Sequence, residues 1–133
     1  MSHFTQVETK INDLVCLQAA LVELGLEFEL ATEKELVKVR GWKGSTLTAE
    51  AKFKASKSYD IGLQLTEQGT YKVIADWWGI EEETGETQQA IMQKVTVCYA
   101  KHKVKAEVAK QGFTVDEVTE EADGTVKIGV SKW

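Results

Sequence analysis

The segment from Leu47 to Ala55 constrains the fold most, because it alternates apolar and polar side chains without a break. One side carries only apolar residues, namely Leu47, Ala49, Ala51, Phe53 and Ala55. The other side carries Thr48, Glu50, Lys52 and Lys54. Successive side chains of a strand point to opposite faces, so this pattern predicts a strand with one face in the core and the other in solvent.

Two more strand patterns follow this segment, and short turns separate them. Residues 59–66 and 70–76 both alternate, and the turns fall at Ser56-Lys57-Ser58 and Gln68-Gly69. Short turns between neighbouring strands predict an antiparallel meander. The same alternation places Asp60 on the polar side, so we expect this side of the sheet to face solvent or a partner.

Two segments have the apolar spacing of helices. Leu14, Leu17, Leu21 and Leu24 form one stripe. Asn12 is the expected N-cap of this helix, and Gly25 is expected to end it. The second helix is expected over 88–111, capped by Thr87 or Thr84 and ended by Gly112.

The remaining segments complete the expected order of elements. Strand patterns occur at 3–11, 26–30, 36–40, 113–118 and 126–130, with a hairpin signal at Asp123-Gly124. The stretch 77–86 is acidic and is expected to be a loop. This order predicts one α+β domain over 1–133: a two-layer sandwich whose mostly antiparallel sheet carries two helices on one face, loosely ferredoxin-like.

Composition limits the compartment and the class of protein. The chain has 133 residues, a formal net charge of −5 and no proline. No apolar run approaches the roughly 18 residues that a membrane span needs, and Met1 to Gln6 lacks the features of a secretory signal. We therefore expect a protein of the cytoplasm or the plastid stroma. In such a reducing compartment we expect no disulfide between Cys16 and Cys98.

Two aromatic motifs are candidate partner-binding sites. Arg40-Gly41-Trp42-Lys43-Gly44 places two cations around an aromatic ring on a turn, where they could hold an anion or an acidic patch. The alternative is an ordinary turn with Trp42 folded over the sheet. Trp77 and Trp78 follow a strand, and an extended backbone would send one to the core and the other outward. The alternative is that both cover the edge of the core.

Cys98 and His102 are four residues apart on one expected helix face, a spacing that can present two ligands to a metal. His3, Cys16 or a carboxylate would have to supply another ligand. The same face carries apolar residues, and cysteine is often buried, so a structural pair is the alternative. A Cys–His nucleophile would need a cleft and an orienting third group, which this helix face does not offer. No cofactor is therefore expected.

Two basic stretches, 33–57 and 94–110, are candidate nucleic-acid contacts. The first holds seven basic and three acidic residues. Lysines of both stretches could contact phosphates, but a solvated surface explains them without a ligand and is the favoured interpretation. The sequence has no aromatic-rich RNA-binding strand and no GXXG loop.

Several short segments together resemble a known family. They are Met1-Ser2-His3-Phe4, Val39-Arg40-Gly41-Trp42-Lys43-Gly44, Tyr59-Asp60-Ile61-Gly62-Leu63, Ala75-Asp76, Tyr99-Ala100 and Gln111-Gly112-Phe113. In this order they resemble the hypothetical chloroplast reading frame thirty-five family, also called domain of unknown function twelve fifty-seven. The resemblance implies a cyanobacterial or plastid setting, with a cyanophage source also open, and carries over no catalytic residue. The stretch 77–86 is more acidic than the family pattern.

These observations favour a non-enzymatic accessory protein that binds an unknown protein partner. The expected partner-binding residues are Arg40, Trp42, Lys43, Trp77 and Trp78. One alternative is an RNA- or nucleotide-binding protein that uses the two basic stretches. The other is a metal or redox protein that uses Cys98 and His102, with His3 as a further candidate ligand. A monomer and a homodimer are both compatible with the sequence.

Overall fold

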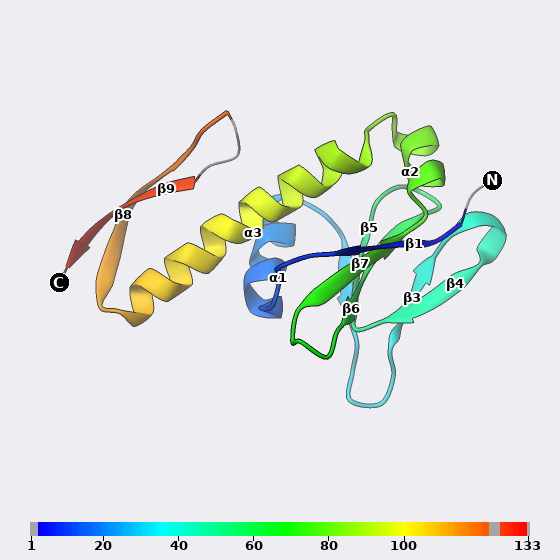
Figure 1. Ribbon diagram of the computed structural model, residues 1–133, viewed down its shortest axis with the longest axis horizontal. Helices are drawn as coiled ribbons and strands as arrows, with labels where there is room; N and C mark the ends of the chain where they lie inside the picture. The colour runs from blue at the N-terminus through cyan, green and yellow to red at the C-terminus, as the bar shows by residue number, and fades with distance from the viewer. Residues whose placement is uncertain (1–2, 123–125, 133) are drawn as a thin grey trace.

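The computed structural model describes residues 3–122 and 126–132. Its centre is a five-stranded antiparallel sheet (Figure 1). In spatial order the strands are β1 (Thr5–Glu8), β7 (Tyr71–Ala75), β6 (Asp60–Leu65), β5 (Ala51–Lys54) and β2 (Phe28–Leu30). The expected meander is confirmed, because β5, β6 and β7 are neighbours joined in sequence order.

Two helices, α1 (Leu14–Glu23) and α3 (Gln88–Lys110), cover one face of the sheet. The leucine stripe of α1 packs there, and Leu17 and Leu21 are each 1% exposed. The Asp13 side chain, rather than that of Asn12, caps α1 by accepting from the Cys16 N–H at 3.1 Å. Thr87 caps α3 in the same way through the Ala90 N–H.

A separate hairpin covers part of the opposite face. It consists of β3 (Val37–Arg40) and β4 (Thr46–Ala49), and it packs Val37, Val39 and Ala49 against Ile74 of β7. Gly62 allows this close approach, because a Cβ atom there would lie 2.4 Å from Val39 Cγ2. The expectation that this face is solvated is wrong for Asp60, which is 2% exposed.

The alternating segment 47–55 is not one strand. It divides at Glu50, so that β4 pairs with β3 while β5 pairs with β2 and β6. Ala49, Ala51 and Phe53 are all buried, but the prediction that they share one face is wrong: Ala49 packs with Val39 and Ile74, whereas Ala51 and Phe53 belong to the core beneath the helices. Leu47 lies outside the core at 39% exposed.

The acidic stretch expected to be a loop contains a helix, α2 (Trp77–Thr84). Asp76 is its N-cap and accepts from the Gly79 N–H at 3.2 Å. A Cβ atom at position 79 would lie 2.2 Å from the Tyr59 ring, so glycine lets α2 pack closely against the sheet. A cap and a close helix contact thus outweigh the polar composition of this segment.

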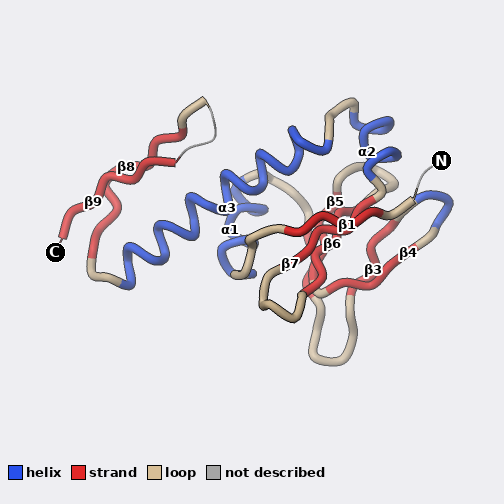
Figure 2. Tube along the Cα trace, in the orientation of Figure 1, coloured by secondary structure: helices blue, strands red, loops and turns tan. Residues whose placement is uncertain are grey.

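The chain ends in a second hairpin, β8 (Phe113–Glu120) with β9 (Val126–Lys132). Figure 2 shows it beside the far end of α3, away from the five-stranded sheet. The α+β class and the mostly antiparallel pairing are confirmed. The ferredoxin-like arrangement is not, because no described strand after α3 returns to the central sheet. The expected turn at Asp123-Gly124 lies outside the described residues.

Candidate functional site

The turn after β3 carries the first group of expected binding residues. A short 3₁₀ helix, η1 (Trp42–Gly44), forms it, and Lys43 has a positive φ of 51°. Trp42 is 41% exposed. The Lys43 ammonium lies 4.5 Å from the centre of the Trp42 ring, within the range of a cation–π contact. The turn therefore presents an aromatic ring and a cation together.

Arg40 is engaged inside the chain. Its Nε and Nη2 donate to the two carboxylate oxygens of Asp60 at 3.0 and 2.9 Å, and its Nη1 donates to the Lys57 carbonyl at 2.8 Å. Lys52 Nζ donates to the same carboxylate at 3.2 Å. Burial opposes ionisation of Asp60, but the bonds from Arg40 and Lys52 outweigh it and hold the pKa of that carboxyl below its ordinary value.

These contacts give Arg40 a structural role, because they tie the β3–β4 hairpin to the central strand β6. A role for Arg40 in partner binding stays a prediction. The buried position of Asp60 was missed because strand alternation says which side a residue faces, not what later covers that side.

The two adjacent tryptophans occupy the first turn of α2, not an extended segment. Trp77 is 6% exposed and belongs to the core, whereas Trp78 is 54% exposed. The buried Trp77 Nε1 has no hydrogen-bond partner among the described residues. One tryptophan thus packs inside and the other faces solvent, although the backbone differs from the extended one that we expected.

The exposed members of both motifs lie toward one end of the molecule. Figure 1 shows η1 and α2 at the same end of its long axis, opposite the β8–β9 hairpin. We call the set Trp42, Lys43 and Trp78 the aromatic end. Its two tryptophans are each at least 41% exposed.

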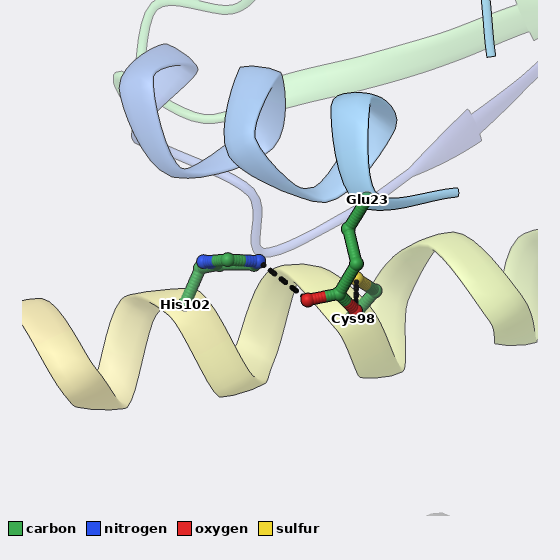
Figure 3. Close-up of side chains that lie close together, drawn as sticks. All are labelled: Glu23, Cys98 and His102. Carbon is green, nitrogen blue, oxygen red and sulfur yellow. Dashed lines mark hydrogen bonds and ion pairs between the residues drawn. The ribbon is translucent and has the colours of Figure 1, made fainter. Parts of the chain in front are cut away.

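A second group of side chains meets between α1 and α3 (Figure 3). Cys98 Sγ donates to Glu23 Oε2 at 2.9 Å, and His102 Nε2 lies 3.2 Å from Glu23 Oε1. The three ligand atoms all lie within 4.8 Å of one another. Among the described residues this is the group that could hold a metal ion, and neither His3 nor Cys16 belongs to it.

Glu23 was not foreseen, because helical spacing shows which residues share a face of one helix but not which residues of another helix lie opposite. The only signal was its place in the last turn of α1, beside the leucine stripe. Cys98 is 3% exposed, while the side chains of His102 and Glu23 are 23% and 48% exposed. The group is therefore buried at the sulfur and open to solvent at the carboxylate.

The electrostatics of this group keep the sulfur protonated near neutral pH. Burial first, and then the hydrogen bond to Glu23, raise the pKa of Cys98 to about 11. The same hydrogen bond lowers the pKa of Glu23, and Lys101 Nζ stands 3.9 Å from Glu23 Oε2. A thiol in this state is a poor nucleophile, so the arrangement does not suit Cys–His catalysis.

Lysines of the stretch 94–110 form ion pairs with acidic groups nearby. Lys94 pairs with Glu86 at 3.0 Å, Lys101 with Glu120 at 3.3 Å, and Lys103 with Asp13 at 3.4 Å. These pairs reduce the positive charge that this helix offers to a phosphate backbone.

The fold and these sites define a small α+β protein with an exposed aromatic end and a Glu–Cys–His group between two helices. The family described as "Protein of unknown function (DUF1257)" matches residues 20–128, and the chain belongs to this family. The resemblance noted in the sequence is thereby confirmed.

Similar proteins extend over the whole chain. Proteins named "Uncharacterized protein ycf35" from Cyanophora paradoxa and Pyropia yezoensis are 28% and 27% identical to it. One from Guillardia theta is 25% identical. Each comparison covers 100% of this chain and 98% of the relative. No solved structure matches.

Across the described residues, no helix is both long enough and apolar enough to cross a membrane.

Proposed function

We propose that this protein is a non-enzymatic accessory protein of the cyanobacterial cytoplasm or plastid stroma that binds a protein partner through the aromatic end. The observation that carries the proposal is the exposure of two tryptophans, Trp78 at 54% and Trp42 at 41%. Tryptophan is among the side chains that most often anchor protein interfaces.

The chemistry around the tryptophans suggests the kind of partner. Lys43 stacks on Trp42, so this part of the surface combines an apolar contact with a positive charge. The stretch 33–57 has seven basic and three acidic residues, of which Arg40 and Lys52 are paired with Asp60. A partner that offers carboxylates beside an apolar pocket would complement both features.

The test is an affinity capture from a cyanobacterial lysate with the full chain as bait, read by mass spectrometry. The decisive comparison is among the wild type, Trp78→Ala, Trp42→Ala and a control, Val22→Ala. Val22 is 66% exposed on α1, outside the aromatic end, so its truncation removes exposed apolar surface elsewhere. Circular dichroism shows whether each variant is folded.

The proposal predicts one protein that the wild type and Val22→Ala capture and that both tryptophan variants lose. Replacing either tryptophan is expected to weaken the binding free energy by more than about 1 kcal/mol. Equal capture by all four baits would contradict it. Capture that disappears after nuclease treatment would replace it with the RNA-binding alternative. Light scattering on the purified chain shows whether the bound species is a second copy.

A further inference from the structure

We propose that Glu23, Cys98 and His102 form a Zn²⁺ site between α1 and α3, with one coordination position open to solvent. This site is separate from the aromatic end and does not depend on the proposed function. It uses one ligand from the last turn of α1 and two ligands from adjacent turns of α3.

The geometry needs little change to accept the ion. A tetrahedral zinc ion with bonds of about 2.3 Å to sulfur and about 2.0 Å to nitrogen or oxygen sets its ligand atoms about 3.3–3.6 Å apart. Cys98 Sγ lies 2.9 Å from Glu23 Oε2, and His102 Nε2 lies 3.2 Å from the other carboxylate oxygen, Oε1. With one ligand atom from each residue, all three separations are within 4.8 Å. Rotamer adjustments of about 1 Å at exposed Glu23 and half-buried His102 bring all three atoms into range.

The donor set favours zinc over the commoner hard cations. Thiolate sulfur and imidazole nitrogen are ligands for zinc, whereas Mg²⁺ and Ca²⁺ require oxygen atoms. Three protein ligands with an open fourth position are typical of zinc sites that bind a water molecule or a further ligand. Because Glu23 and His102 reach the surface while Cys98 does not, the open position faces solvent.

Binding replaces existing interactions and releases the thiol proton. Zn²⁺ forms a bond to Sγ of Cys98 and displaces its proton to solvent, and Glu23 exchanges the S–H donor for the metal. Lys101 loses part of its attraction to Glu23 but keeps its ion pair with Glu120 at 3.3 Å. The competing interpretation is a metal-free polar clamp, in which Glu23 simply joins the two helices by hydrogen bonds.

The experiment uses the full chain without a polyhistidine tag, titrated with Co²⁺ and then Zn²⁺. Thiolate ligation of Co²⁺ produces a charge-transfer absorption, and competition by Zn²⁺ removes it. Variants Cys98→Ala, His102→Ala and Glu23→Gln test each ligand, and Cys16→Ser is the control. Cys16 is a second buried cysteine, on α1 and outside the group.

The proposal predicts one metal per chain for the wild type and Cys16→Ser, with the absorption present in both. Each ligand variant is expected to bind at least about 100-fold more weakly, because even the outer partners of metal ligands contribute about 10- to 100-fold. A wild type that gives no thiolate absorption would overturn the proposal and favour the clamp. So would unchanged binding by a folded Cys98→Ala variant.

Discussion

The ion pair between Arg40 and Asp60 makes the strongest prediction about stability. Arg40→Met removes the two side-chain donors at 3.0 and 2.9 Å and leaves a carboxylate that is 2% exposed. Removing one partner of a buried pair costs about 3–5 kcal/mol. Lys52 Nζ and the Arg40 backbone N–H still donate to Asp60, at 3.2 and 3.0 Å. We therefore expect a loss at the lower end, about 3 kcal/mol.

Urea unfolding followed by tryptophan fluorescence measures this loss. With a slope of about 1.5 kcal/mol per molar urea, a loss of about 3 kcal/mol lowers the midpoint by about 2 M. The control Lys34→Met removes an exposed cation from a loop and is expected to change the free energy of unfolding by less than about 0.5 kcal/mol. A similarly small change for Arg40→Met would refute the argument that Asp60 depends on its arginine.

The double variant Arg40→Met with Asp60→Leu distinguishes two effects: the loss of the ion pair itself, and the cost of burying the Asp60 carboxylate without its arginine. Replacing both partners by apolar groups is often nearly neutral. The double variant should therefore be more stable than Arg40→Met alone. If its free energy of unfolding falls by the sum of the losses measured for Arg40→Met and Asp60→Leu alone, the two side chains are not coupled.

Lowering the pH should reduce the difference in the free energy of unfolding between the wild type and Arg40→Met. The pKa of Asp60 is lowered in the folded chain, so its contribution is present above its unfolded pKa of about 3.9 and is lost as the pH falls through the folded value. Below that range Asp60 is protonated in both proteins. A midpoint difference that stays constant from pH 7 to pH 3 would contradict this assignment.

Three further outcomes are expected. Gly62→Ala should cost about 1–3 kcal/mol in urea unfolding, because the new Cβ would lie 2.4 Å from Val39 Cγ2, and adding Val39→Ala should recover part of the loss. Thr87→Ala should cost about 1 kcal/mol in the same assay, since it removes the cap of α3. Cys98, whose pKa is about 11, should react with a thiol reagent at pH 8 far more slowly than unfolded chain does, and fast reaction of the native protein would contradict its burial.

Local patterns predicted the elements that depend on local physics. The leucine stripe and Gly25 gave α1, and the alternation gave the buried side chains of β5, because neighbours in sequence determine these features. The division at Glu50 and the position of the β3–β4 hairpin depend on which distant strands meet, and no periodicity encodes that. The helix α2 was missed because its acidic composition hid the capping role of Asp76.

In the candidate sites, too, features set by neighbours in sequence could be predicted, and contacts between distant segments could not. Cys98 and His102 share a helix face, so the sequence could pair them. Glu23 could not be added, because only the packing of α1 on α3 brings it there. Likewise, one tryptophan of the adjacent pair was expected to face outward, but the engagement of Arg40 by Asp60 depends on a contact between separate strands.

The position of β1 at the edge of the sheet affects how the chain assembles during synthesis. β1 leaves the ribosome before β7, yet β7 is its only strand partner in the described sheet, in the register Thr5 with Ala75. The meander of β5, β6 and β7 needs only local contacts and can form as it emerges. β1 must therefore stay unpaired until β7 has been made, which takes several seconds at about 5–20 residues per second. The edge strand that completes this side of the central sheet is therefore made well before its partner.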